Sequence, residues 1–367
     1  MRWLVIAGPV SGYTFELFRH VRQEAGVDVC FVRAAWESSG AHAHDTFVAP
    51  DFPTLVWPGP SIRELRDFIL YPAPDAVLVY GTFARLPIVV ASLGLPPTVP
   101  VLFVADVNIA DLSGQAWRTM FRAAAHRVLL GRATGALSLG LTNRLALEIL
   151  GARRVLDAPF YAVDYSRFGE MGPLIPPTVD GRLSILLVAR HVPEKNLVPF
   201  ATAVARSPSL ARNVHLVFVG DGPERPVLKQ LVDGSPTLSA DILGPLKPDR
   251  LGPLFRQAAA LALPSAVEPW GNVVTEALGM GVPVVCSPAV GAGVSLAGLT
   301  QAVVVADDPS GEAMCKALAR FVDRLHALRE AARAAAPIVR ARYDMRAAAS
   351  RMLGAVQGLN SGSERPR

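Results

Sequence analysis

The sequence predicts an α/β protein of two doubly wound, Rossmann-like domains that face each other across a cleft. Strand-like and helical patterns alternate along almost all of the chain. The strand-like runs are apolar throughout instead of alternating, which is typical of a parallel sheet covered by helices on both faces. A length of 367 residues is enough for two such domains, each with its own core.

The first half contains five strand-like runs with helical patterns between them. They span residues 2–8, 27–32, 76–80, 99–104 and 134–139. The first run has one Arg and could be a signal peptide, but Gly8 ends it and a helical pattern follows, so we interpret it as a buried first strand. A second helical pattern, residues 61–70, opens with a capping box of Ser61 and Glu64.

The second half repeats this organisation without a detectable sequence repeat. Its strand-like runs span residues 183–189, 214–220, 260–264, 283–287 and 302–306. The join is expected within residues 168–182, which carry three Pro and three Gly and no periodicity. We therefore expect a first domain over residues 1–170 and a second over residues 180–338.

Composition narrows the possible partners and compartment. The net charge of +5 could suggest nucleic acid, but the Arg residues are scattered and aromatic residues make up only 7%. No apolar run reaches the ~18–20 residues that a membrane helix needs. The three Cys are far apart, which suits a reducing cytosol. The densest basic block, residues 329–351, is either a solvated helix face or a weak contact with a membrane surface.

In parallel sheets, ligands bind beyond the carboxyl ends of the strands, so the residues that follow each strand are the candidates for a site. Arg190 and Lys195 follow the run 183–189, in a loop that leads into a helix starting near Asn196. A loop can aim both cations at one point, and the helix N-terminus adds its dipole. Both residues suit a phosphate or diphosphate, although they could also be two solvated loop charges.

A second candidate follows the run 260–264, where Glu268 and Gly271 precede a helix that carries Glu276. Gly271 removes side-chain bulk where backbone N–H groups point into the cleft. Glu276 could accept two hydrogen bonds from a vicinal diol such as a ribose. It could also be an ordinary partner of the helix dipole. In the first half, Gly12 after the first strand permits close approach of a diphosphate, but the glycine spacing is not the dinucleotide fingerprint.

Taken together, these segments resemble the family 4 glycosyltransferases, which are retaining nucleotide-sugar enzymes of GT-B fold. Five segments occur in the family's order, most clearly from residue 182 to 292. They are "PFYAVDYSRF", "VARHVPEKN", "VFVGDGPER", "ILGPLKPDRLGPLFRQAAALALPS" and "EPWGNVVTEALGMGVPVV", the last with the family's E-x7-E signature.

The resemblance implies a role for each matching residue. Arg190 and Lys195 hold the diphosphate, and Glu276 holds the ribose hydroxyls. The donor sugar and phosphate are held by Glu268 and by the backbone around Trp270, Gly271 and Asn272. Gly244 to Leu246 border the nucleobase, and Gly12 closes over the diphosphate. The resemblance also implies that a C-terminal helix of about residues 340–357 packs back on the first domain.

Two positions depart from the family's pattern. Trp270 stands where the family often has Phe, which implies a reshaped donor pocket. Asp106 follows the run 99–104, roughly where many members have a His near the acceptor and the reacting carbon. Asp106 is therefore either a catalytic group on the acceptor side or a plain helix-cap or turn residue.

The predicted function is transfer of a sugar from a nucleotide-diphosphate sugar to an acceptor, with retention of configuration. No D-x-D motif is present to ligate a metal, so we expect Arg190 and Lys195 to serve that charge and no cofactor to be required. The acceptor is a glycan, a lipid-linked molecule or a small molecule, as in cell-envelope polysaccharide synthesis. We expect a cytoplasmic enzyme, with peripheral contact at the inner membrane face as one option. The alternatives are a nucleotide-sugar epimerase and a non-catalytic interaction protein of the same fold.

Overall fold

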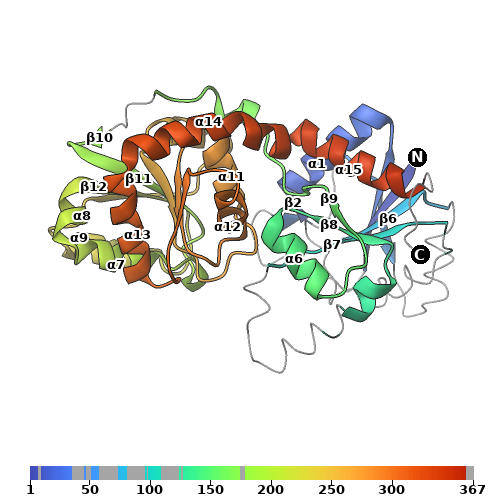
Figure 1. Cartoon of the computed structure of the whole chain (residues 1–367), viewed down its shortest axis with the longest axis horizontal. Helices are drawn as coiled ribbons and strands as arrows, with labels where there is room; N and C mark the ends of the chain where they lie inside the picture. Colours follow the sequence, from blue (N-terminus) through green and yellow to red (C-terminus); the bar gives the residue numbers. More distant parts are fainter. Residues whose placement is uncertain are drawn as a thin grey trace. The chain divides into compact units, whose positions relative to one another are not determined.

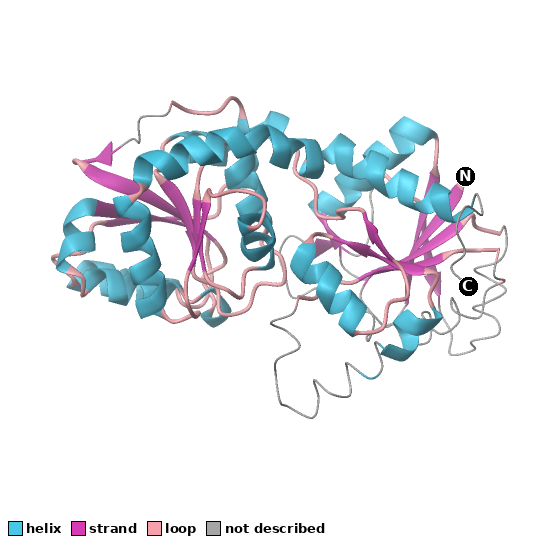
Figure 2. Cartoon of the chain, viewed as in Figure 1, coloured by secondary structure: helices cyan, strands magenta, loops and turns pink. Residues whose placement is uncertain are grey.

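The computed structural model describes residues 1–6, 10–34, 45–46, 51–57, 73–80, 96, 98–108, 124, 127–173 and 178–360. Figures 1 and 2 show the course of the chain and its secondary structure. The predicted helix over residues 61–70, with its capping box, and Gly8 lie outside the described residues.

The chain divides into two compact units. The first comprises Met1–Ala162 and Met345–Arg367, and the second comprises Val163–Asp344. The expected domain limits, 1–170 and 180–338, are therefore wrong by several residues. Residues 163–170 belong to the second unit because the Val163 N–H donates to the Tyr343 carbonyl at 2.8 Å. The Tyr165 hydroxyl likewise donates to the Thr275 carbonyl at 2.9 Å.

The first unit is built on a parallel sheet of seven strands in the order β5-β3-β1-β6-β7-β8-β9. The strands are β1 (Arg2–Ile6), β3 (Asp28–Ala34), β5 (Thr54–Trp57), β6 (Ala76–Tyr80), β7 (Val101–Val104), β8 (Gly135–Ser138) and β9 (Val155–Asp157). A separate antiparallel pair joins β2 (Val10–Ser11) to β4 (Asp45–Thr46). Strands β1, β6, β7 and β8 are buried along almost their whole length, as their continuous apolar sequences predicted.

Among its described residues, this unit has the helices α1 (Gly12–Ala25), α6 (Leu141–Ile149) and α15 (Met345–Asn360), and residues 127–132 are also helical. Helix α15 packs against α1, and the two run side by side in Figure 1. The Ser350 hydroxyl donates to Glu24 at 3.0 Å, and Arg351 lies 3.5 Å from Asp157 on β9. The helix that packs on the first unit is therefore Met345–Asn360, not about 340–357, because residues 340–343 end the preceding helix of the second unit.

The second unit has its own sheet, in which six strands run parallel in the order β13-β12-β11-β14-β15-β16 and β10 pairs antiparallel with β11. The strands are β10 (Thr178–Val179), β11 (Arg182–Val188), β12 (Val214–Val219), β13 (Ala240–Leu243), β14 (Ala260–Leu263), β15 (Val284–Cys286) and β16 (Val303–Val305). Every residue of β12, β14 and β15 is buried.

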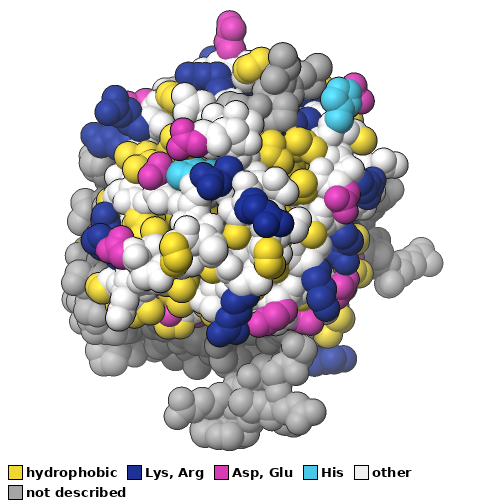
Figure 3. Space-filling view, turned by 90° about the vertical axis from the view of Figure 1, so that its left-hand side faces the viewer, with side chains coloured by type: hydrophobic (Ala, Val, Ile, Leu, Met, Phe, Trp, Pro, Cys, Tyr) yellow, Lys and Arg dark blue, Asp and Glu magenta, His cyan; other side chains and the backbone are white. Residues whose placement is uncertain are grey.

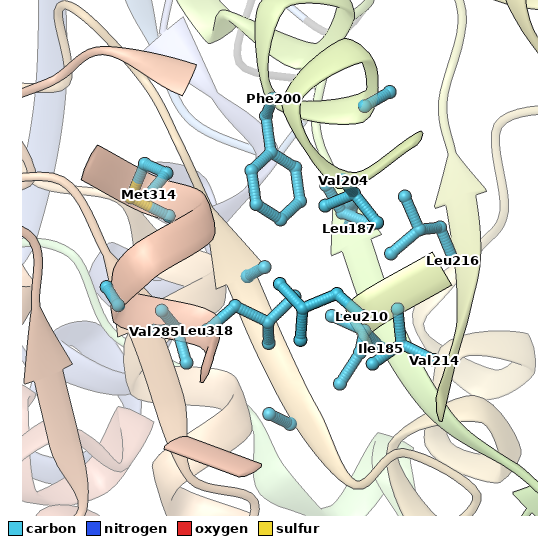
Figure 4. Close-up of a cluster of buried hydrophobic side chains, with 14 of the residues drawn as sticks. Ile185, Leu187, Phe200, Val204, Leu210, Val214, Leu216, Val285, Met314 and Leu318 are labelled. Atoms are coloured by element: carbon cyan, nitrogen blue, oxygen red, sulfur yellow. The ribbon is translucent and has the colours of Figure 1, made fainter. Parts of the chain in front are cut away.

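Helices cover this sheet and join its strands. They are α7 (Leu197–Ala205), α8 (Pro208–Asn213), α9 (Arg225–Gly234), α10 (Pro248–Arg256), α11 (Asn272–Gly279), α12 (Gly291–Ala297), α13 (Gly311–Asp323) and α14 (Leu325–Tyr343), with short 3-10 helices η1 (Tyr165–Phe168) and η2 (Pro193–Lys195). Helix α7 packs against α13 and α9, whereas α11 packs against α14. Figure 4 shows the core beneath α7 and α13, where Phe200, Met314 and Leu318 meet Ile185 and Val285 of the sheet.

Two arginines of the basic block over residues 329–351, Arg329 and Arg340, bond to the protein itself. The Arg329 side chain is buried and donates to the carbonyls of Ala258 and Pro173, each at 2.8 Å. Arg340 donates to the Gly279 carbonyl at 2.6 Å. These guanidinium groups satisfy backbone carbonyls within the second unit, so both readings from the sequence are wrong for them.

No helix among the residues that the structure describes is long and apolar enough to cross a membrane. On the face of the second unit that Figure 3 presents, acidic and basic side chains are interspersed and no large patch of one sign is visible.

Candidate functional site

The strand order of the second unit brings the predicted site residues to one edge of its sheet. Parallel strands end at the same edge, and β11 lies between β12 and β14. Arg190 and Lys195 follow β11, and Glu268 to Asn272 follow β14. Gly244 and Leu246 follow β13 at the end of this row, two strands away from β11.

The loops after β11 and β14 are joined by an ion pair between Lys195 and Glu268. The two side chains are only 14% and 15% exposed, so the pair is largely screened from water. The Ser265 hydroxyl lies 3.5 Å from the same Glu268 oxygen, and the Glu194 carbonyl accepts from Ala266 N–H at 2.8 Å. Two residues that the sequence assigned to one ligand are thus neighbours, and each fixes the other's position.

Backbone geometry places the start of α7 beside this pair. Lys195 ends η2, and Asn196 adopts a left-handed conformation with φ 55°, so α7 starts at Leu197, one residue after the predicted start. Asn196 Nδ2 donates to the Pro309 carbonyl at 2.6 Å, which holds the turn. Arg190 lies two residues after the end of β11 and is exposed at the same edge of the sheet. A row of cations beside a helix start suits an anionic ligand.

Gly271 controls the approach to α11. Its φ of 94° is a conformation that favours glycine, and a methyl group there would lie 3.1 Å from Glu268 Cγ and 3.2 Å from Leu263 Cδ2. No side chain caps the first turn of α11. The first N–H groups of a helix have no intrahelical acceptor, so this terminus can bind an anion. Asn272 is the first residue of that turn, and its side-chain oxygen is buried without a hydrogen-bond partner among the described residues.

The Trp270 side chain does not line the loop where the resemblance implied a reshaped donor pocket. Its side chain is 1% exposed, and its ring centroid lies 5.6 Å from that of Tyr343 at the end of α14. Its carbonyl accepts from the Ala292 N–H at 2.8 Å. The indole therefore packs in the interior of the unit, and only the backbone of Trp270 is at the loop that precedes α11.

Glu276 lies on α11 and is only 3% exposed. It is the fifth residue of the helix, beyond the first turn where a carboxylate acts mainly as a dipole partner. Burial and the nearby Glu276 charge together raise the pKa of the Tyr165 hydroxyl well above its usual value. Burying a carboxylate is costly without strong hydrogen-bond or charge partners. The simple dipole reading of Glu276 therefore does not account for its position.

His191 is a residue of the site that the sequence reasoning missed. Its side chain is fully buried, and neither ring nitrogen has a hydrogen-bond partner among the described residues. Burial, followed by the positive charge of Arg225, lowers the pKa of the His191 ring, and Asp221 opposes the shift. A polar residue directly between Arg190 and the apolar Val192 was the available signal.

The glycine turn after β12 holds the backbone of His191. Gly220 and Gly222 have φ of 138° and 155°, and a methyl group on either would collide with the carbonyl of Ala189 or of His191. The His191 N–H donates to the Asp221 carbonyl at 2.8 Å, and the Glu224 N–H donates to the His191 carbonyl at 2.9 Å. The Asp221 side chain accepts a hydrogen bond from the Gly222 N–H at 2.9 Å within this turn.

The end of β15 adds a serine pair that the sequence reasoning also missed. The Ser287 hydroxyl donates to the Ser265 carbonyl at 2.5 Å and accepts from the Ala289 N–H at 3.2 Å. Glu268 lies in a parallel bridge with Val290, and its carbonyl accepts from the Gly291 N–H at 3.1 Å. These bonds hold the Glu268 loop against the next strand end.

The remaining predicted residues lie in the first unit. Asp106 is exposed after β7 and accepts a hydrogen bond from the Tyr161 hydroxyl at 2.9 Å. Residues 105–108 are extended or irregular, and residues 109–123 lie outside the described part of the chain. The buried Asn143 side chain donates to the carbonyls of Ala105 and Val107, at 2.9 and 2.6 Å, and so fixes the backbone on either side of Asp106. Gly12 is the exposed first residue of α1, and an added methyl group would meet no atom within 4 Å.

Comparison with known proteins finds a family match within the second unit. Residues 182–324 match the family described as "Glycosyl transferases group 1". Over 177 residues the chain is 28% identical to the alpha-D-kanosaminyltransferase of Streptomyces kanamyceticus, a match that covers 48% of this chain and 46% of that protein. The match thus spans less than half the length of this relative.

Solved structures match over nearly the whole chain. HepE of Anabaena in complex with UDP has a TM-score of 0.71 and 14% identity, covering 97% of this chain and 99% of that one. Sucrose-phosphate synthase from Thermosynechococcus elongatus has a TM-score of 0.70 and 14% identity, covering 99% and 100%. At this identity the likeness shows the fold, and the predicted GT-B fold of two parallel-sheet α/β domains is confirmed.

Proposed function

We propose, from the match of residues 182–324 to the family described as "Glycosyl transferases group 1", that the chain transfers a sugar from a nucleotide-diphosphate sugar to an acceptor. The observation that carries the proposal is the edge of the second sheet. There the Lys195–Glu268 pair joins two adjoining loops, and helix α11, with its uncapped start and the buried Glu276, follows the second of them. Cations and helix N–H groups suit a diphosphate, and a buried carboxylate suits a ribose diol.

Each residue of the row has a proposed role. Arg190 and Lys195 bind the diphosphate, with Glu268 holding the Lys195 ammonium in place and facing the donor sugar. Glu276 accepts the ribose hydroxyls. The backbone of Trp270, Gly271 and Asn272 supplies N–H groups, and Gly244 to Leu246, beyond the glycine turn, border the base.

The chemistry follows from where charge develops. Breaking the bond between sugar and phosphate builds negative charge on the leaving diphosphate. Fixed cations and N–H groups aimed at that charge stabilise the transition state more than the ground state, which raises the rate. We propose that Arg190, Lys195 and the α11 terminus do this without a metal, and that the configuration of the sugar is retained. The resemblance gives Gly12 and Asp106 roles toward the diphosphate and the acceptor, and these stay predictions.

A uridine nucleotide is the donor base we propose to test first, since the similar HepE structure was solved with UDP. The acceptor is proposed to be a glycan, a lipid-linked molecule or a small molecule of cell-envelope synthesis. The cytoplasm is the proposed compartment, because all three cysteines are free thiols.

The test combines binding and turnover on the full chain. A thermal-shift screen against nucleoside diphosphates identifies the base, because a ligand raises stability in proportion to ln(1 + [L]/Kd). The matching nucleotide sugars are then assayed for nucleotide release with and without acceptor, in EDTA and in added Mg²⁺. Release that is stimulated by acceptor and unchanged in EDTA supports metal-independent transfer. Conversion of the sugar without nucleotide release would instead indicate an epimerase, and binding of no nucleotide would remove the proposal.

A further inference from the structure

Helix α6 of the first unit packs one side against the sheet and leaves apolar side chains of its other side exposed. Leu141, Leu145 and Ile149 are spaced by four residues, so they lie along one side of the helix. All three are exposed, at 52%, 37% and 57%. The opposite side is in the core, where Ala146 and Leu147 are fully buried. The helix therefore presents two different faces.

A further exposed apolar residue and several arginines lie in the segments just before and after α6. Val128 is 54% exposed. The helical residues around it lie alongside the end of α6, because a methyl group on Gly151 would be 3.1 Å from Arg127 Cγ. Arg127, Arg132 and Arg153 are exposed, and Arg144 rises from α6 itself between Leu141 and Leu145. Leu141, Leu145, Ile149 and Val128, with these four arginines, are called the α6 face below.

Charge on this segment is strongly one-sided. Residues 127–154 contain five Arg and one acidic residue, Glu148, giving a formal charge of +4. Glu148 lies 3.8 Å from Arg144. The whole chain has a net charge of only +5. The segment is thus strongly positive, although residues 329–351 carry the same formal charge, and an anionic partner complements it.

We propose that the α6 face docks on the surface of a bilayer that contains anionic phospholipids. Aliphatic side chains along one side of a helix can enter the boundary between head groups and acyl chains. Guanidinium groups beside them bind phosphate through paired hydrogen bonds. Basic residues near an anionic leaflet each add to the attraction.

The size and composition of the face favour a lipid surface over a protein. Leu141 and Ile149 are two turns apart, which is about 12 Å along the axis. A stable protein interface buries about 800 Å² on each partner and is usually anchored by aromatic residues. The α6 face, as defined above, contains aliphatic and Arg side chains and no aromatic anchor. Shallow insertion reinforced by charge needs no comparable area.

Docking does not depend on the proposed transfer reaction, because the residues of the α6 face lie in the first unit and the proposed nucleotide site in the second. It is separate from the membrane contact expected at residues 329–351, where Arg329 and Arg340 bond backbone carbonyls of the second unit.

The test is co-sedimentation of the full chain with vesicles of phosphatidylcholine, with and without phosphatidylglycerol, at low and at high salt. We expect binding to the anionic vesicles that weakens in salt. The pair Leu141→Gln and Ile149→Gln should lower the partition coefficient about tenfold or more. Arg132→Gln and Arg153→Gln should lower it about fivefold each.

Matched controls replace equally exposed residues of the second unit. Val227→Gln with Leu299→Gln, at 51% and 61% exposure, match the apolar pair, and Arg212→Gln with Arg250→Gln match the basic pair. These four changes should leave vesicle binding unchanged. All the altered side chains are exposed, so each variant should melt like the parent chain, and melting is measured for each.

Three results would overturn the proposal. The parent chain could fail to bind anionic vesicles. The α6 variants could bind as well as the parent, or the controls could lose as much. Finally, light scattering could show a concentration-dependent dimer that the Leu141→Gln and Ile149→Gln pair abolishes, which would assign the face to a second copy of the chain. Nucleotide affinity measured without vesicles tests the proposed donor site separately.

Discussion

Three charged side chains of the proposed donor site are largely buried. Lys195 and Glu268 are 14% and 15% exposed, and Glu276 is 3% exposed. Most acidic and basic side chains of globular proteins stay in water, because burial is costly. Side chains that carry such a cost are common where a ligand is bound. The three residues are therefore the best places to test the function by substitution.

Glu276→Gln should lower the affinity for the bare nucleoside diphosphate by about tenfold or more, because charged hydrogen bonds to a ribose diol are strong. The amide keeps the shape of the side chain, so the melting temperature should change little. Calorimetric titration of the nucleotide measures the effect. Glu312→Gln is the control, since Glu312 is an acidic residue in the first turn of α13 and should affect stability alone. Unchanged nucleotide affinity in Glu276→Gln would return this residue to a structural role.

Lys195→Ala should weaken diphosphate binding and slow transfer about a hundredfold, the usual effect of removing one group that stabilises a developing anion. Glu268→Gln should slow transfer while keeping most of the affinity for the bare nucleotide, because it keeps a hydrogen-bond partner for Lys195. Nucleotide titration and steady-state turnover of both variants and of the double variant measure the coupling. Wild-type affinity in Lys195→Ala would remove the diphosphate assignment.

His191 should make the folded chain sensitive to mild acid. Its pKa is lowered from the ordinary 6.5 by burial and by Arg225, so the folded chain binds a proton less readily than the unfolded chain. The contribution of His191 to the free energy of unfolding is therefore complete above the pKa that its ring has in the unfolded chain. It is lost as the pH falls from there toward the lower pKa of the folded chain. His191→Leu should flatten the fall in melting temperature over this range. Exposed His326→Leu is the control, and equal pH profiles for parent and His191→Leu would contradict the prediction.

Helix α11, which carries Glu276, is held in place by contacts with Tyr165 and Arg340. The Tyr165 ring lies against Gly279, and its hydroxyl donates to the Thr275 carbonyl at 2.9 Å. Arg340 donates to the Gly279 carbonyl at 2.6 Å while its guanidinium lies 5.1 Å from the centre of the Tyr165 ring. The helix that carries Glu276 is therefore fixed by residues from both ends of the second unit's sequence.

Gly279→Ala should be strongly destabilising, because the new methyl group would overlap the Tyr165 ring. Overpacking of a close contact commonly costs about 1–3 kcal/mol. Gly354→Ala in α15 is the matched control: an added methyl group there meets nothing within 4 Å, and a helical Gly→Ala change stabilises by about 0.5–1 kcal/mol. Denaturant unfolding of both variants measures the difference. Equal stabilities would show that Tyr165 moves aside without cost.

In the whole molecule the chain passes between its two units twice, so the first unit is formed from two separate segments. The passages fall at Ala162–Val163 and Asp344–Met345. They are tied within the second unit, where the Val163 N–H donates to the Tyr343 carbonyl and Val163 bridges Asp344. Helix α15 then completes the first unit, with Met352 and Val356 fully buried.

Truncation after Asp344 should destabilise the first unit and leave the second nearly unchanged, because only α15 is removed. Truncation after Ala336 also removes Arg340 and Tyr343, so it should lower the stability of both units. Scanning calorimetry separates the two transitions. The same melting profile for both truncated chains would show that the end of α14 does not support α11, and a first unit unaffected by either would show that α15 is dispensable.

Much of the fold could be predicted because the signals are local. Continuous apolar runs indicated the buried strands of both sheets, and the short glycine-rich turns indicated where they end. The limits between the units could not be predicted, because they depend on pairing between Val163 and Tyr343, 180 residues apart in sequence. The buried position of the Trp270 indole likewise depends on Tyr343, which no local pattern connects to it.

The sequence by itself determined the alternation of strands and helices, the doubly wound α/β class and the set of charged and glycine residues that follow the main strands, because hydrophobic periodicity and turn chemistry are properties of neighbouring residues. The GT-B fold was predicted from the family resemblance, and the short strands β5, β9 and β13 were not among the predicted runs. Only the tertiary structure decided which of those residues meet. Lys195 and Glu268 lie 73 positions apart and pair because β11 and β14 are adjacent strands. Burial of His191 and Glu276, and exposure of Leu141 and Ile149, were decided in the same way, since the surroundings of a side chain come from segments distant in sequence.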